Sequence, residues 1–241
     1  MNSPPKVSVI IPILNEEASI GKVIDAIPKK STPEIICVDN GCTDSSPEIA
    51  ESMGARVIHE PRKGYGSAVW AGITAASKPD IVVFLDGDLS DHPEEMPRLI
   101  QPIIRGEADM VSGSRLLGQV EPGALPPHSV FGNRLASWLL RWFFKVECTD
   151  LGPFCAIAYD KLIALDMRDR RFGWPMELRA KMAVKGFRML EVPVRYRKRI
   201  GKSKITGNLA NSFRAGWMIL WTFFVLGSSF MIHRGRQNDE R

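Results

Sequence analysis

Only four cysteines occur among the 241 residues, and their spacing matches no metal-binding cluster. Cys37 lies inside an apolar stretch, so the sequence predicts reduced, mostly structural thiols in a cytosolic setting rather than disulfides. Internal repeats, low-complexity segments and any signature of RNA or DNA binding are absent, which excludes a repeat protein and predicts no nucleic-acid partner. The first residues lack a basic region followed by an apolar core, so no signal peptide is expected.

The composition that remains is that of an ordinary globular protein. Hydrophobic residues make up 44% of the chain and charged residues 24%, which is enough for one sizeable core. The formal net charge is +5, and most of the basic excess lies late in the sequence. Without a nucleic-acid signature, this excess indicates contact with phosphates or with an anionic membrane.

Apolar runs typical of buried strands alternate with amphipathic stretches through the first half of the chain. Strands are expected at residues 7–12, 35–38, 56–59, 81–86 and 110–115, with helices between them. Pro12 should end the first strand, and a loop rich in glycine and proline should follow the fifth. This alternation predicts an α/β fold with a doubly wound, mainly parallel sheet of the Rossmann-like type.

The fourth predicted strand ends in two carboxylates, Asp86 and Asp88, separated by Gly87. Side chains two residues apart in an extended segment point the same way, and glycine lets a ligand approach the backbone. Two carboxylates at the carboxyl edge of a parallel sheet suit Mg²⁺ or Mn²⁺ carrying a diphosphate. The alternative is an acidic turn in which Asp91 or His92 caps the next helix.

Further motifs follow one another along the chain in a characteristic order. They are Val9–Pro12 with Asn15–Glu17, Val38–Asp44, Lys63–Gly66, Asp86–Leu89, Gly113–Arg115, Gly132–Arg134, Thr149–Phe154, Gly173–Leu178, Val192–Val194 and Arg199–Ile205. Together they resemble the family 2 glycosyltransferases of the GT-A fold, above all the dolichyl-phosphate and other polyprenyl-phosphate sugar transferases. The resemblance covers roughly residues 7 to 207.

The resemblance implies a role for each matching residue. The pocket for the nucleotide sugar would be formed by Pro12, Asn15, Glu16, Asp39, Lys63, Gly64, Gly66, Asp86, Gly87, Arg199, Lys202 and Ser203. Within it, Asp39 would lie near the base, and the glycine loop could offer its amides to a phosphate. Asp86 and Asp88 would hold the metal.

Four further residues complete the implied catalytic set with Asp88. Arg115 and Arg134 would flank the donor and acceptor phosphates. Asp150 and Glu177 could act as the general base toward a hydroxyl acceptor, or position groups for a phosphate acceptor. For Glu177, a helical ion pair with Lys181 is the alternative.

Three positions depart from the family's common pattern. Asn40 stands where a second aspartate is common, Ser90 where several relatives carry glutamine, and Cys155 where many carry arginine. The last departure removes one candidate phosphate contact and weakens the expectation for the acceptor.

The implied activity is metal-dependent, inverting transfer of a hexose from a UDP- or GDP-linked donor to a polyprenyl phosphate. A saccharide or other hydroxyl acceptor is the alternative within the fold. A sugar-1-phosphate nucleotidyltransferase would need a basic glycine-rich loop after the first strand, where this chain has Pro12 to Glu16. A non-catalytic binding subunit is the remaining alternative, and a homo-oligomer is left open.

Two apolar segments indicate contact with a membrane. Residues 130–146 combine tryptophan and phenylalanine with Arg134, Arg141 and Lys145, which favours an interfacial helix over a core helix. Residues 216–232 carry no charge and approach the length of a membrane span. We therefore expect a GT-A domain at residues 1–210, a membrane-associated helix with a basic tail at 211–241, and a catalytic domain facing the cytosol.

Overall fold

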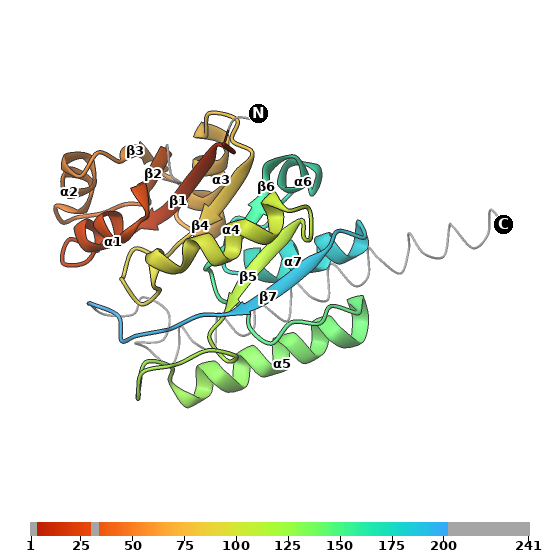
Figure 1. Ribbon diagram of the computed structural model, residues 1–241. Helices are drawn as coiled ribbons and strands as arrows, with labels where there is room; N and C mark the ends of the chain where they lie inside the picture. Colours follow the sequence, from red (N-terminus) through yellow and green to blue (C-terminus); the bar gives the residue numbers. More distant parts are fainter. Residues whose placement is uncertain (1–3, 30–33, 202–241) are drawn as a thin grey trace.

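The computed structural model describes residues 4–29 and 34–201. These residues form a seven-stranded sheet in the order β3-β2-β1-β4-β6-β5-β7 (Figure 1). The strands are β1 (Val7–Ile13), β2 (Glu34–Asp39), β3 (Arg56–His59), β4 (Ile81–Phe84), β5 (Met110–Ser114), β6 (Cys155–Ala158) and β7 (Met189–Pro193). Only β6 runs against its neighbours, β4 and β5, so the sheet is mixed but mainly parallel, as predicted.

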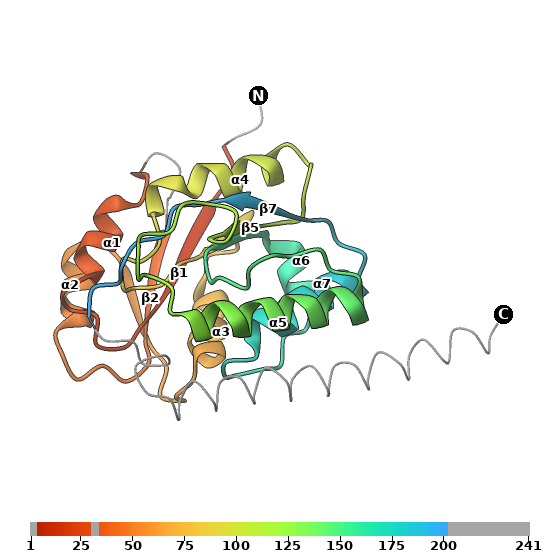
Figure 2. The ribbon, with the colours of Figure 1, turned by 90° about the horizontal axis from the view of Figure 1, so that it is seen from below.

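Helices cover both faces of the sheet, which gives the doubly wound arrangement. The helices are α1 (Ile20–Ala26), α2 (Ser46–Ser52), α3 (Tyr65–Ala75), the short η2 (Pro93–Glu95), α4 (Met96–Ile104), α5 (Pro127–Phe144), α6 (Tyr159–Ala164) and α7 (Trp174–Val184). The first core cluster joins one face to α1, α2 and α4, and the second joins the other face to α3, α6 and α7. Helix α5 lies outside α7 and packs against it (Figure 2).

Strand β1 shows why the strand sequences are continuously apolar. Val9 and Ile11 pack into one core cluster and Ile10 into the other, and all three are fully buried. A strand covered by helices on both faces needs apolar residues at every position. The same reason accounts for β4, which is buried along its whole length.

The expectation that Pro12 ends the first strand is wrong by one residue, because β1 continues to Ile13. Pro12 pairs with Val38 of β2, whereas the ladder between β1 and β4 stops at Ile10. The missing N–H of proline therefore falls where β1 has no partner on its other side, which is where a sheet tolerates proline.

Strands β6 and β7 were not among the expected elements. Each is short, and their pairing with β5 joins segments far apart in the sequence. Strand β7 leads directly into residues 194–201, which the site below uses.

Several expectations fall outside the described residues, namely Lys202, Ser203 and the segment 211–241. Among the described residues, no helix is both long enough and apolar enough to cross a membrane.

The two fully enclosed thiols are expected to be unreactive in the folded protein. Burial raises the pKa of Cys37 to about 12 and that of Cys155 to about 11. Because the thiolate is the reactive form, a rise of three pKa units from about 9 should slow alkylation of Cys37 about 1,000-fold at neutral pH. Mass spectrometry after iodoacetamide treatment, with and without urea, measures this, and rapid labelling of folded Cys37 would contradict it.

Candidate functional site

Polar side chains from several strands meet at the carboxyl edge of the sheet. Asp86 and Asp88 follow β4, Glu16 follows β1, Asp39 ends β2 and Arg115 follows β5. Because these strands run in the same direction, their carboxyl ends share one edge, where open α/β sheets bind ligands. The structure therefore brings together residues that the sequence separates by about one hundred positions.

Asp88 is held from two sides. The amide and hydroxyl of Ser90 donate hydrogen bonds to its Oδ1 at 2.9 and 2.6 Å, and the guanidinium of Arg199 forms an ion pair with its Oδ2. The amide of Ile200 donates to the Asp88 carbonyl at 2.9 Å, so the segment after β7 lies across this turn. The departure at Ser90 thus has a local function, which is to orient Asp88.

The Asp86 carboxylate is engaged by no hydrogen bond or ion pair from residues 4–29 or 34–201. Burial and the nearby charges of Asp88 and Asp91 raise its pKa well above the ordinary value, although Arg199 opposes this. Nor do the described residues contain a cluster of three or more metal-binding side chains. Two carboxylates with little else form an incomplete cation site that needs oxygen ligands from elsewhere, and a diphosphate and water can supply them.

His92 stands at the N-cap of the helix that opens at Pro93, as that alternative expected, but neither its side chain nor that of Asp91 makes a capping hydrogen bond. The Asp91 carboxylate is 2% exposed, and neither oxygen has a hydrogen-bond partner in the part of the chain that the structure describes. Burial and the charges of Asp88 and Asp150 raise its pKa to about 7, against the opposing charge of Arg115. Asp91 was not among the expected site residues, because its burial depends on contacts between distant segments.

Asp39 and Asn40 order the loop after β2. Asp39 accepts hydrogen bonds from the amides of Gly41 and Cys42, and its Oδ2 lies 3.0 Å from Nδ1 of His59. Burial alone would raise the pKa of Asp39, but these hydrogen bonds hold it below the ordinary value.

The hydrogen bonds of Asn40 explain why asparagine stands where the family commonly has a second aspartate. Its side-chain amide donates to the carbonyls of Glu60 and Arg62, both at 2.9 Å, and its oxygen accepts from the amide of Gly64 at 2.8 Å. An aspartate has no donor for those two carbonyls. Asn40 therefore holds the glycine loop in place.

The glycine loop was expected to expose its amides to a phosphate, but the amides of both its glycines are engaged by protein atoms. The amide of Gly64 is bound by Asn40, and that of Gly66 donates to the carbonyl of Arg171 at 3.0 Å. A Cβ at Gly64 would lie 2.3 Å from the carbonyl oxygen of Arg170, so glycine here allows two backbone segments to touch. Lys63 stays exposed beside Gly41 and still borders the loop after β2.

Glu177 of α7 holds the 168–171 segment, which is the backbone that the glycine loop contacts. Its buried carboxylate accepts hydrogen bonds from the amides of Arg168 and Asp169, and it forms an ion pair with Lys181 at 2.7 Å. The helical pair with Lys181 is confirmed, but Glu177 is buried and positions the 168–171 segment. It is therefore not a free base.

Alanine at Gly66 should destabilise the protein by about 1–3 kcal/mol, the usual cost of overpacking. The added Cβ would lie 2.4 Å from the carbonyl oxygen of Asp169, which belongs to the backbone. The matched control is Gly132→Ala, another helical glycine, where no atom lies within 4 Å. That control should stabilise by up to about 1 kcal/mol, since alanine is the better helix former. Urea unfolding midpoints compare the two, and equal shifts would contradict the proposed contact.

Asp150 and Arg115 form a buried ion pair. Three nitrogens of Arg115, including its own amide, donate to the Asp150 carboxylate at 2.7–2.8 Å, and Asn133 and the amide of Gly152 donate as well. Burial alone would raise the pKa of Asp150, but the bonds from Arg115 hold it below the ordinary value. Asp150 is therefore unsuited to be a general base, and it aligns Arg115 instead. The Arg115 guanidinium also lies 5.0 Å from the ring centre of Tyr196.

Arg134 extends this side of the site outward. It is exposed on α5 and lines a hollow of about 300 Å³ together with Leu116, Leu117, Ser137 and Thr149. Cys155 is buried in β6 opposite Phe84, so no phosphate contact is available at that position.

A family model and curated relatives each match more than half of this chain. The model of the glycosyl transferase family 2 matches residues 8–161. An uncharacterized glycosyltransferase of Mycobacterium tuberculosis is 39% identical over 87% of this chain and 94% of its own length. The dolichyl-phosphate hexose transferase of Haloferax volcanii is 35% identical over 82% of this chain and 86% of its own length.

Solved structures are similar as well. Glucosyl-3-phosphoglycerate synthase from Mycobacterium tuberculosis, in complex with Mn²⁺, uridine diphosphate and glucosyl-3-phosphoglycerate, superposes with a TM-score of 0.75 at 25% identity. The match covers 93% of this chain and 80% of that chain. The same enzyme has been solved with Mg²⁺ and uridine diphosphate, at the same TM-score and identity.

Proposed function

Because the chain belongs to glycosyl transferase family 2, we propose that it transfers a hexose from a UDP- or GDP-linked donor to a polyprenyl phosphate at the cytoplasmic face of a membrane. The observation that carries this proposal is the pair Asp86 and Asp88 at the carboxyl edge of the sheet. Among the described residues the first carboxylate has no hydrogen-bond or ion-pair partner, and the second faces a guanidinium. A site that concentrates negative charge in this way favours a cation.

Asp86 and Asp88 would hold Mg²⁺ or Mn²⁺. Their fit rests on the two hard oxygen donors and on Arg199, whose positive charge already lies against Asp88. When bound, the ion neutralises charge that develops on the departing diphosphate. The similar synthase was solved with either ion and uridine diphosphate, which supports the same choice of cofactor here.

The nucleotide would lie against the loops after β1 and β2. The side-chain oxygen of Asn15 accepts a hydrogen bond from the amide of Thr43, and the amide of Glu16 donates one to the hydroxyl of Ser46, so these two loops hold each other. Asp39 and Lys63 border the same region. Arg199, with Lys202 and Ser203 beyond it, would close over the diphosphate once a cation replaces the guanidinium at Asp88.

A phosphate acceptor needs little base catalysis. Its oxygen forms a bond to the anomeric carbon while the bond from that carbon to the diphosphate breaks, which inverts the configuration. A phosphate monoester has a second pKa of about 6 and is largely ionised at neutral pH, so no proton must be removed first. This agrees with the finding that Asp150 and Glu177 are both committed to structural hydrogen bonds. Arg115 and Arg134 would hold the acceptor phosphate.

A hydroxyl acceptor is the second candidate, and one observation favours it. Asp91 is a buried carboxylate with no hydrogen-bond partner among the described residues, and a hydroxyl nucleophile would need such a base. The similar synthase has also been solved with phosphoglyceric acid. An Asp91→Asn variant separates the two candidates, since only a hydroxyl acceptor requires that base.

The test is a panel of UDP and GDP hexoses with a polyprenyl phosphate in detergent, and with phosphoglycerate as the competing acceptor. We expect one donor to yield a chloroform-soluble, acid-labile sugar product. A water-soluble product instead would favour the hydroxyl acceptor. Metal-dependent nucleotide binding without turnover of any donor would favour a non-catalytic subunit. The three departures give that view little support, because Asn40, Ser90 and Cys155 each have a structural role.

A further inference from the structure

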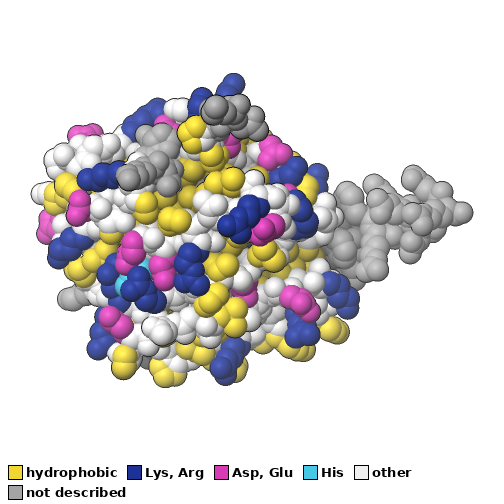
Figure 3. Space-filling model, in the orientation of Figure 1, with side chains coloured by type: hydrophobic (Ala, Val, Ile, Leu, Met, Phe, Trp, Pro, Cys, Tyr) yellow, Lys and Arg dark blue, Asp and Glu magenta, His cyan; other side chains and the backbone are white. Residues whose placement is uncertain are grey.

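Helix α5 carries an exposed aromatic stripe on the side away from α7. Phe131, Leu135, Trp138 and Trp142 are 70%, 38%, 57% and 60% exposed. They follow one another at intervals of four, three and four residues, which places them within about 60° of each other around the helix. Hydrophobic side chains lie along the lower edge of Figure 3, where Figure 1 places α5.

The opposite side of α5 explains why the stripe cannot simply turn inward. Ala136, Leu140 and Phe144 are buried and pack with Met176 and Ala180 of α7. The alternative of a core helix therefore holds for one side of α5. One side of α5 belongs to the core, and the other presents large apolar side chains to the outside.

Basic side chains run beside the stripe. Arg134, Arg141 and Lys145 are exposed and lie within about 60° of Trp138 on one flank of the helix. Helix α5 contains no acidic residue. Glu147, just beyond it, lies 3.8 Å from Arg141, and both side chains are more than 70% exposed, so this pair neutralises little charge.

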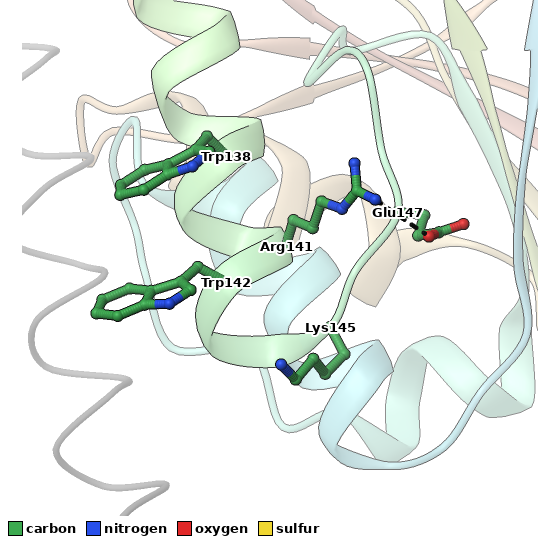
Figure 4. Close-up of a pocket in the computed structure, with 5 residues that line it drawn as sticks. All are labelled: Trp138, Arg141, Trp142, Lys145 and Glu147. Atoms are coloured by element: carbon green, nitrogen blue, oxygen red, sulfur yellow. Dashed lines mark ion pairs between the residues drawn. The ribbon is translucent and has the colours of Figure 1, made fainter.

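The two tryptophans form a platform next to these charges. Their rings stack with centres 5.9 Å apart and planes 10° from parallel, and the rings of Trp142 and Phe143 meet in a T-shaped contact. Figure 4 shows both indoles pointing the same way from α5. With Arg141, Lys145 and Glu147 they line an open hollow of about 430 Å³.

We propose that this face of α5, the aromatic stripe with its basic flank, lies on the surface of an anionic phospholipid bilayer. The inference rests on the proposed function, since it states which face of the protein meets the membrane that holds the acceptor. Tryptophan is enriched at the boundary between headgroups and acyl chains, and arginine and lysine bind anionic headgroups. The alternation of the two along one helix face is typical of an interfacial helix.

Charge argues against a second copy of the chain as the occupant. A symmetric contact through this face would place the three basic side chains of one copy near those of the other, with no acid on α5 to compensate. An anionic bilayer supplies the opposite charge over the whole face.

The placement also suits the acceptor. Arg134 belongs to the basic flank and also lines the hollow with Leu116, Leu117 and Thr149. Thr149 precedes Asp150, which aligns Arg115. A phosphate at headgroup depth would thus enter the site beside Arg134, with its hydrocarbon chain still in the bilayer.

An environment-sensitive fluorophore at position 142 tests the proposal directly. The full chain would carry Cys42→Ser and Cys148→Ser, which remove the two partly exposed thiols among the described residues, and then Trp142→Cys for labelling. Met53→Cys at the end of α2, also exposed, is the matched control. With vesicles of phosphatidylcholine and phosphatidylglycerol, we expect label emission at 142 to rise and shift to the blue, and to be quenched by nitroxide-bearing lipids. The label at 53 should not respond.

A charge variant gives a second readout. Arg141→Gln should weaken binding of the full chain to these vesicles about fivefold, as expected for one basic residue near an anionic surface. The control is Arg105→Gln at the end of α4, and it should leave vesicle binding unchanged. The proposal is overturned if the protein floats with vesicles while the label at 142 stays unchanged, or if that label responds to protein concentration without lipid. Neither measurement needs a nucleotide-sugar donor. If the protein transferred sugar in detergent but the label at 142 did not respond to vesicles, the proposed membrane face would be wrong and the proposed function would stand.

Discussion

Replacing Asp88 by alanine is expected to lower the rate of sugar transfer at least about 100-fold, which corresponds to about 2.7 kcal/mol of barrier. Asp88 supplies one of the two carboxylates that face the cation, and Ser90 and Arg199 hold it in place. Initial rates with the preferred donor measure the effect. The folded state should persist, since the variant also removes a carboxylate from a crowded acidic cluster.

Arg199→Ala distinguishes two explanations of that loss. If Asp88 binds the cation, removing the competing guanidinium should leave Mn²⁺ affinity unchanged or increase it, whereas Asp88→Ala should abolish it. Calorimetric titration with Mn²⁺ at a saturating concentration of nucleoside diphosphate gives both values, so that any contact of Arg199 with the diphosphate does not limit the comparison. A loss of Mn²⁺ binding in Arg199→Ala equal to that in Asp88→Ala would mean that Asp88 acts by holding the 197–201 segment instead.

Asp150→Asn is expected to destabilise the protein by about 3–5 kcal/mol, because it leaves the buried guanidinium of Arg115 without its counter-charge. The Asp150 side chain is 0% exposed and that of Arg115 is 15% exposed, so water cannot replace the lost partner. Urea unfolding at neutral pH measures the change. The control is Asp25→Asn, which breaks an exposed pair with Lys29 and should cost less than about 1 kcal/mol.

The loss of unfolding free energy at low pH gives an independent check on the role of Asp150. Its pKa is lowered in the folded state, so its contribution is complete above the unfolded value of about 3.9 and is lost as the pH falls through the folded value. In Asp150→Asn this part of the acid dependence should disappear. A variant that keeps the full acid dependence, or loses no stability, would contradict the buried pair.

Features carried by a short stretch of sequence were predicted well. The acidic pair after β4 needed only a buried apolar run and the residues that end it, and the sheet edge followed from the strand alternation. The helical pair of Glu177 with Lys181 likewise depends on spacing alone.

Features that depend on distant contacts were missed or misassigned. The glycine loop has the composition of a phosphate loop, but the amides of its two glycines donate to Asn40 and Arg171, the latter more than one hundred residues away. Asp150 was expected to act as a possible general base, because its partner Arg115 lies far away in the sequence and cannot be identified from nearby residues. The enclosure of Asp91 has the same cause.

Diffraction data collected at the manganese absorption edge, from crystals grown with Mn²⁺ and the nucleoside diphosphate, test the central assignment most directly. The anomalous signal should lie between the carboxylates of Asp86 and Asp88 and the diphosphate, with Arg199 moved away from Asp88. A manganese signal elsewhere, or a bound diphosphate with the Asp88–Arg199 pair intact and no metal beside it, would contradict the assignment.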